Sequence, residues 1–207
     1  MPSSLPAPAN QHTQTVGASS AVGRALTTAE LRQPKPDRRA FRARARFPVQ
    51  VVLDQVRQGY NVGAVFRLCD AFLCEQLVIC GRDDARGMRK LVQAAQGTQK
   101  WVPWRSADTA ADVVQVARDG GYQIVALEQT SGATSLDRFQ PRYPVCLVLG
   151  SERAGVSQAV LDLADVAVAI TMQGMANSLN VATAAAIVLH AMAEGFQDLA
   201  RVRERER

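Results

Sequence analysis

Histidine is scarce in this 207-residue sequence, which has only His12 and His190. The long stretch between them therefore holds no imidazole for acid–base catalysis or for a histidine metal site. Four cysteines are present, at Cys69, Cys74, Cys80 and Cys146. They form no C-x-x-C pair and lie within apolar runs, so the sequence predicts neither a zinc site nor a disulfide framework. We expect reduced core cysteines and no bound metal.

Two glycine-rich motifs are missing as well. The sequence has no G-x-x-x-x-G-K-[ST] and no G-x-G-x-x-G, which excludes P-loop NTPases and the usual dinucleotide-binding domains. Long apolar runs are also lacking, because residues 181–193 fall short of the ~18–20 residues that a membrane span needs. The N-terminus has no basic segment followed by an apolar one, as a secretory signal would. We therefore expect a cytoplasmic protein with no membrane partner.

Positive charge is concentrated near the N-terminus. The chain has a net charge of +5, and residues 1–47 carry eight basic against two acidic residues, a net of +6, so the rest nets −1. Residues 1–33 are rich in Pro, Ser, Thr and Ala, and such a composition buries too little apolar surface to fold. We expect residues 1–47 to form a disordered basic arm. Such an arm is typical of a protein that binds nucleic acid, and the alternative is a solubilising tail.

From residue 48 onward, short β-branched runs alternate with helical patterns. Buried strands are predicted at residues 49–53, 77–80, 122–127, 145–149 and 166–170, and a weaker edge strand at 100–104. Helices are predicted at residues 62–73 with Asn61 as cap, 89–96, 107–119, 157–163 and 178–196. This alternation predicts an α/β domain over residues 48–200, with a mostly parallel sheet and helices on both faces. Residues 201–207 are expected to form a charged C-terminal tail.

Three of the predicted strands are followed by loops that combine glycine with small polar residues. These loops read EQTSGAT from residue 128, GSERAGVS from residue 150 and TMQGMANSLN from residue 171. Ligands in such folds bind beyond the carboxyl ends of the strands, so the three loops are predicted to line one pocket. Asn177, Ser178 and Asn180 stand where the last helix begins. They indicate either a ligand-binding loop at a helix N-terminus or ordinary caps.

Three blocks of the sequence occur in a familiar order. They are NVGAVFR at residues 61–67, LVLGSERAGVS at 147–157 and ITMQGMANSLNVATAAA at 170–186. Together they resemble the three motifs of the SpoU/TrmH branch of the SPOUT RNA methyltransferases, over residues 49–194. The resemblance implies S-adenosylmethionine-dependent transfer of a methyl group to a ribose 2′-hydroxyl of tRNA or rRNA, with no DNA substrate. It further implies a deep C-terminal trefoil knot and an obligate homodimer. The last predicted helix is apolar nearly all round, so we expect the homodimer to form through this C-terminal helix.

The resemblance also implies the residues of the site. Those implied around S-adenosylmethionine are Leu127, Leu149, Gly150, Ile170, Met172 and Leu179. Those implied in catalysis are Arg67, Asn61, Glu152, Ser178 and Asn180. An arginine stays protonated and is a poor base, which favours a role for Arg67 in gripping the phosphate beside the target ribose, although the base role stays open. The alternative function is a catalytically inactive RNA-binding protein that keeps the fold.

Overall fold

The computed structural model describes residues 24–32, 37–81 and 85–205. The chain divides into two compact units, Met1–Phe41 and Arg42–Arg207. The N-terminal arm carries two short helices, α1 (Thr28–Arg32) and α2 (Arg38–Arg42). The described part of the arm thus has local helical structure that its composition did not predict. For residues 1–23 and 33–36, which lie outside the described residues, disorder stays a prediction.

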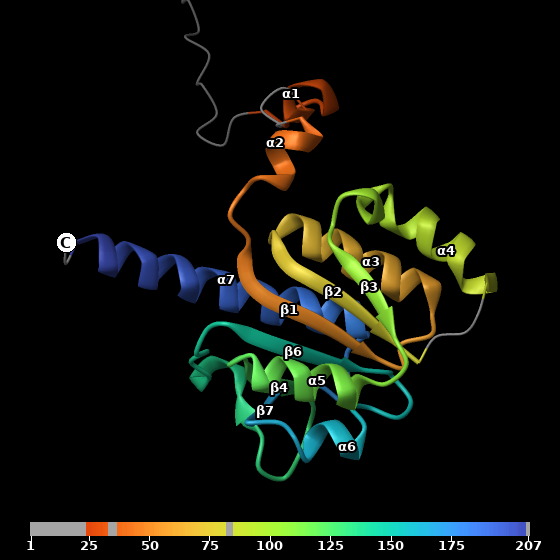
Figure 1. Cartoon of the computed structure of the whole chain (residues 1–207), viewed down its shortest axis with the longest axis vertical. Helices are drawn as coiled ribbons and strands as arrows, with labels where there is room; N and C mark the ends of the chain where they lie inside the picture. The colour runs from red at the N-terminus through yellow and green to blue at the C-terminus, as the bar shows by residue number, and fades with distance from the viewer. Residues whose placement is uncertain (1–23, 33–36, 82–84, 206–207) are drawn as a thin grey trace, which may run out of the picture. The chain divides into compact units, whose positions relative to one another are not determined.

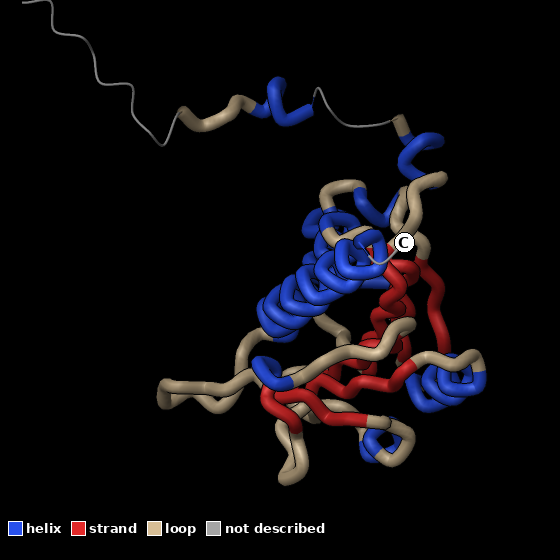
Figure 2. The backbone as a smooth tube through the Cα atoms, turned by 90° about the vertical axis from the view of Figure 1, so that its left-hand side faces the viewer, coloured by secondary structure: helices blue, strands red, loops and turns tan. Residues whose placement is uncertain are grey.

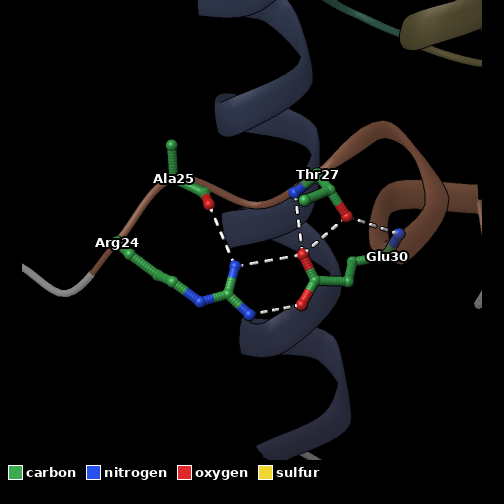
Figure 3. Close-up of polar contacts among 4 residues, drawn as sticks. All are labelled: Arg24, Ala25, Thr27 and Glu30. Carbon is green, nitrogen blue, oxygen red and sulfur yellow. Dashed lines mark hydrogen bonds and ion pairs between the residues drawn. The ribbon is translucent and has the colours of Figure 1, made fainter.

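Helix α1 is held by side chains at its own N-terminus (Figure 3). The Thr27 hydroxyl accepts from the Glu30 N–H at 3.3 Å, and the Glu30 carboxylate accepts from the Thr27 N–H at 2.7 Å, which forms a capping box. The Arg24 guanidinium donates to both oxygens of the same carboxylate, at 2.5 and 3.1 Å. These bonds, with that of Arg24 first, lower the pKa of Glu30 to about 2.

The second unit is built on a parallel sheet (Figure 1). Its strands are β1 (Phe47–Asp54), β2 (Cys74–Cys80), β3 (Trp104–Ala107), β4 (Gln123–Leu127), β5 (Thr134–Ser135), β6 (Val145–Gly150) and β7 (Val166–Ala169). They are ordered β3-β2-β1-β6-β4-β7-β5, and every pairing of these strands is parallel. The predicted α/β fold with a mostly parallel sheet is confirmed. Strand β1 begins at the buried Phe47, one residue before the predicted start of the domain.

The weak edge strand predicted at residues 100–104 is misplaced. Thr98–Lys100 form a 3₁₀ turn, and β3 begins only at Trp104, although it does lie at the sheet edge. Proline at position 103 has no N–H to donate to the neighbouring strand. Its carbonyl still accepts from the Leu77 N–H at 3.0 Å, so pairing with β2 starts at Pro103 and continues into β3.

Helices cover both faces of the sheet (Figure 2). They are α3 (Gly59–Ala71), α4 (Ala85–Ala95), α5 (Ala110–Asp119), α6 (Gln158–Leu161) and α7 (Val181–Arg205), with a short 3₁₀ turn at Leu136–Arg138. Alternate strand residues face opposite ways, as the pleat requires. Val51 and Leu53 pack against α3, α4 and α7, whereas Val52 packs against α5 and α6. The prediction of helices on both faces is confirmed.

Each predicted helix differs from the structure at one or both of its ends, and two of the differences change the role of residues. Helix α3 begins at Gly59 after Gln58, so Asn61 lies inside the first turn and does not cap it. Helix α7 begins at Val181 and continues to Arg205, through most of the segment predicted as a charged tail. Arginine and glutamate are good helix formers, which lets the helix continue beyond the apolar part that packs on the domain. In the described ranges, no helix is long and apolar enough to cross a membrane.

Candidate active site

The carboxyl ends of β4, β6 and β7 open into one cavity of about 480 Å³. This volume lies within the range of about 300–1,000 Å³ that is common for small-ligand sites. The wall of the cavity includes all six residues predicted around a cofactor, namely Leu127, Leu149, Gly150, Ile170, Met172 and Leu179. Tertiary structure therefore brings these residues together from the ends of β4 and β6 and from the loop between β7 and α7, and their contact with a cofactor stays a prediction.

Carboxylates at two strand ends hold the second loop in place. Glu128, directly after β4, accepts a hydrogen bond from the Val156 N–H at 2.8 Å and so ties the first loop to the second. Asp54, the buried last residue of β1, accepts from the Ser157 N–H at 2.8 Å. Our sequence reasoning missed both residues. The available signal was an acidic residue at the carboxyl end of a buried apolar strand, where its charge needs partners.

The first and third loops are also joined. The Gln129 side chain donates from Nε2 to the carbonyl oxygen of Asn177 at 2.7 Å. Gln129 lies on the cavity wall, and Asn177 directly precedes Ser178, which lies there as well. All three loops are thus linked by hydrogen bonds, so a displacement of one loop changes the shape of the whole cavity.

Gly150 permits an unusually close approach of the second loop to the end of β6. A Cβ atom at this position would lie 2.1 Å from the carbonyl carbon of Gly155 and 2.2 Å from the Val156 nitrogen. The loop closes on itself through the Gly155 N–H, which donates to the Ser151 carbonyl at 2.8 Å. Only glycine fits between the strand end and this turn, so the cavity wall depends on it.

Asn61, Glu152 and Asn180 form a polar cluster beside the cavity. The Asn180 side chain donates to Asn61 Oδ1 at 3.0 Å and to Glu152 Oε1 at 3.4 Å. Asn61 also donates to Glu152 Oε1 and, at 3.2 Å, to Gln58 Oε1. The polar cluster therefore joins the first turn of α3, the second loop and the start of α7.

The residues before α7 divide into two kinds. The Asn180 carboxamide accepts from the Ala182 N–H at 3.0 Å, so this residue caps α7 and also joins the polar cluster. Ser178 lies in the loop before the helix, where it lines the cavity and does not cap. The sequence alone left these two roles open for both residues.

Arg67 is exposed on α3 and does not line the cavity. It makes no hydrogen bond or ion pair with any of the residues that the structure describes. Its helix is nevertheless joined to the cavity through the polar cluster, because Asn61 lies six residues earlier on α3. The guanidinium is therefore available to a ligand that extends beyond the cavity.

The cysteines offer no thiolate to the site. All four are free and buried. Burial raises the pKa of Cys80 to about 11, so its thiol stays protonated at neutral pH. Among the described residues, no group of three or more His, Cys, Asp or Glu side chains is placed to hold a metal ion.

The domain therefore belongs to the class of parallel α/β domains that have a cavity at the carboxyl ends of their strands, where ligands of such folds bind. Within that class, the chain belongs to the SpoU rRNA Methylase family, whose model matches residues 48–190.

Curated relatives agree with this membership. The chain is 32% identical over 148 residues to a tRNA (guanosine(18)-2'-O)-methyltransferase from Escherichia coli K12, with 72% of this chain and 64% of the relative covered. A protein of the same name from Thermus thermophilus is 30% identical over 140 residues, which cover 67% of this chain and 71% of the relative. The chain thus spans somewhat less than two thirds of the length of the Escherichia coli relative.

Solved structures share the fold. The A. aeolicus TrmH/SpoU tRNA modifying enzyme superposes with a TM-score of 0.72 at 27% identity, over 79% of this chain and 84% of that chain. The SpoU methyltransferase AviRb from Streptomyces viridochromogenes, solved in complex with the cofactor AdoMet, gives a TM-score of 0.64 at 28% identity. That match covers 74% of this chain and 60% of AviRb.

Proposed function

We propose that this protein transfers a methyl group from S-adenosylmethionine to a ribose 2′-hydroxyl of tRNA or rRNA. The observation that carries this proposal is the cavity at the strand ends, which in a SpoU family domain gathers all six residues expected around that cofactor. The Escherichia coli and Thermus relatives are named as tRNA 2'-O-methyltransferases, and AviRb has been solved with AdoMet. These likenesses support the substrate class and the cofactor.

The chemistry of the cavity wall fits the cofactor. S-adenosylmethionine supplies an electrophilic methyl group on a positively charged sulfonium. Leu127, Leu149 and Leu179 offer apolar contacts for the adenine ring, and the loop backbones offer hydrogen bonds to its edge. Glu128 and Glu152 also line the cavity, and their carboxylates favour a cation there.

Of the residues predicted in catalysis, Arg67 and Ser178 act on the RNA, and the other three act as positioning residues. The Arg67 guanidinium grips the phosphate beside the target ribose, which positions the 2′-oxygen to attack the methyl carbon. The bond between that carbon and sulfur breaks, S-adenosylhomocysteine leaves, and the hydroxyl proton passes to solvent, to which Arg67 is exposed. Asn61, Glu152 and Asn180 act as positioning residues, because the polar cluster fixes the first turn of α3 relative to the cavity. Ser178, on the cavity wall, orients the target nucleotide.

The C-terminal region carries two further parts of the proposal. Ile187 is 39% exposed on α7, which supports a homodimer formed through this helix. The chain re-enters the sheet at β6, between β1 and β4, and then ends in α7, which packs against α3. This order supports a trefoil knot, in which the C-terminal segment threads through an earlier loop. With tRNA and rRNA as substrates, the cytoplasm is the proposed location.

Two measurements in sequence test the enzyme against an inactive RNA-binding protein. Calorimetric titration with S-adenosylmethionine should show one saturable site per chain. Radiolabelled methyl groups from S-adenosylmethionine should then enter unmodified tRNA or rRNA transcripts, and digestion of the product should yield a 2′-O-methyl nucleoside. Cofactor binding without incorporation into either RNA class would support the inactive protein.

The basic arm is proposed to add salt-dependent RNA affinity without choosing the nucleotide. Arg46 is better assigned to the domain, because its guanidinium donates to the Cys74 carbonyl at 3.2 Å. Deletion of residues 1–41 therefore removes the first compact unit, with five of the basic residues of the arm, without cutting into β1. If about four arm residues contact phosphates, the slope of log affinity against log salt should shrink by about three units. The modified nucleotide should stay the same, and a change of nucleotide would contradict this role.

A further inference from the structure

Basic residues gather on two neighbouring segments of the methyltransferase domain. Residues 55–69 hold two basic and no acidic residues, and residues 85–107 hold five basic and no acidic ones. These segments contain most of α3, all of α4 and β3, and α3 packs directly against α4 (Figure 1). The domain as a whole is nearly neutral, so its positive charge is unevenly distributed and favours a polyanion on this side.

An exposed tyrosine lies where the two helices meet. Tyr60, in the first turn of α3, is 52% exposed although its ring is large and apolar. The Lys90 ammonium of α4 lies over this ring, 5.8 Å from the centroid, which is within cation–π range. The Tyr60 hydroxyl donates to Gln93 Oε1 at 3.5 Å. The ring is therefore oriented by α4 while about half of it stays accessible.

The two helices that carry this pair are held tightly together. A Cβ atom at Gly63 would lie 2.6 Å from the Leu91 carbonyl oxygen, so only glycine permits this approach. Gly63 follows Tyr60 by three residues, and Leu91 directly follows Lys90. Close backbone packing beside the pair means that the ring and the ammonium are presented on a rigid support.

Tyr60 also has a fixed relation to the candidate active site. It directly precedes Asn61 of the polar cluster, and Arg67 follows it by seven residues. Seven residues are almost two helical turns, so Tyr60 and Arg67 lie on the same side of α3, about 10 Å apart along its axis. Both are exposed, and neighbouring nucleotides of one strand can span such a distance.

We propose that Tyr60 and Lys90 form an RNA-binding subsite, in which a base flanking the target nucleotide stacks on the Tyr60 ring and the Lys90 ammonium contacts the adjoining phosphate. This inference rests on the proposed function for the identity of the polyanion. Stacking on an exposed aromatic ring accepts any base, because every base has a flat face. The subsite therefore positions the strand without reading its sequence.

Charge decides between RNA and a second copy of this chain as the occupant. The centres of protein–protein interfaces are depleted in charged residues and in lysine especially. Here a lysine lies against the half-exposed aromatic ring, and residues 55–69 and 85–107 hold seven basic residues and no acidic one. Asp70, near the end of α3, already accepts a hydrogen bond from the Trp101 indole at 2.7 Å. A single-stranded segment of RNA complements both the ring and the charge.

The test compares variants by their affinity for fluorescently labelled, unmodified tRNA and rRNA transcripts over a range of salt concentrations. Tyr60→Ala should weaken binding about tenfold, equivalent to about 1.4 kcal/mol, and leave the salt slope unchanged, since stacking releases no counterion. Tyr60→Phe keeps the ring and should bind within about twofold of wild type. Lys90→Ala should reduce the salt slope by about 0.7–0.9. Val116→Ala on α5, on the opposite face of the sheet, is the exposed apolar control and should change neither quantity.

Unchanged RNA affinity in Tyr60→Ala would overturn the subsite, and so would a Tyr60→Phe variant as weak as Tyr60→Ala. Light scattering that shows an altered oligomeric state in Tyr60→Ala would assign the ring to a subunit contact and also overturn it. Because binding is measured apart from turnover, a wild-type protein that binds these transcripts through Tyr60 but methylates none of them would refute the proposed activity alone.

Discussion

Substitution of Gly150 by alanine tests whether the second loop shapes the cofactor cavity. Ordinary van der Waals contact begins near 3.4 Å, and the new Cβ atom would lie 2.1 Å from the Gly155 carbonyl carbon. The turn at Gly155 would therefore have to move by about 1.3 Å, the difference between these distances. Backbone atoms cannot rotate away as a flexible side chain can, so the loop must shift as a unit.

The movement of the second loop in Gly150→Ala should lower both the stability of the domain and its affinity for the cofactor. The Val156 N–H donates to Glu128 and the Ser157 N–H donates to Asp54, both at 2.8 Å, and a movement of this size breaks both bonds. Overpacking of this kind costs about 1–3 kcal/mol of stability. A domain of this size then loses about 2–4 °C in Tm per kcal/mol. Misplacement of a site by about 1 Å can cost as much as a hundredfold in activity, so we expect at least a tenfold loss of cofactor affinity.

Thermal unfolding measures the loss of stability, and calorimetric titration with S-adenosylmethionine measures the loss of cofactor affinity. Gly132→Ala is the matched control, because Gly132 lies in the loop after β4 and a Cβ atom there would meet nothing within 4 Å. The control should keep both the Tm and the Kd of wild type. A Gly150→Ala protein that binds S-adenosylmethionine within about twofold of wild type would refute the idea that this close approach shapes the cavity.

Three further predictions concern the other parts of the molecule. Arg67→Ala should abolish methyl transfer with cofactor affinity nearly unchanged, and Arg67→Lys should fail too because an ammonium lacks the planar fork. Ile187→Arg should convert a dimer to monomers in light scattering, because it places an unpaired charge at the contact. Ala185 is unsuitable for this test, because it is fully buried and an arginine there would destabilise the domain itself. Glu30 should titrate by NMR with a pKa of about 2, rising toward its ordinary value near 4.5 in Arg24→Ala. The stabilisation of α1 by the Arg24–Glu30 pair is complete when the pH is above the ordinary pKa of 4.5, and it is lost as the pH falls toward 2.

Each of these predictions has an outcome that contradicts it. More than about a tenth of wild-type turnover in Arg67→Ala, a loss under about 1.4 kcal/mol, would remove this residue from catalysis. A wild-type protein that is monomeric at micromolar concentration would exclude the contact through Ile187. A Glu30 pKa near 4.5 in the wild-type chain would mean that the Arg24 pair does not persist in solution.

Much of the fold can be predicted from the sequence because its signal is local. The β-branched runs at the predicted positions all form strands, since consecutive buried side chains suit a sheet covered on both faces. Glycine and small polar residues after β4, β6 and β7 marked the loops that line the cavity. Local patterns were least reliable at element ends, as Asn61 shows, because a polar residue before an apolar run suits a cap and a buried bond equally well.

The tertiary structure alone decided the pairings between distant residues. Asn61 meets Glu152 across 91 positions of sequence, and Asp54 meets Ser157 across 103. No local pattern encodes such contacts, because they depend on the order in which strands enter the sheet, with β6 between β1 and β4. The placement of Tyr60 under Lys90 arises in the same way, from the packing of α3 on α4. Sequence therefore determined which residues are available for binding, and chain topology determined which of them act together.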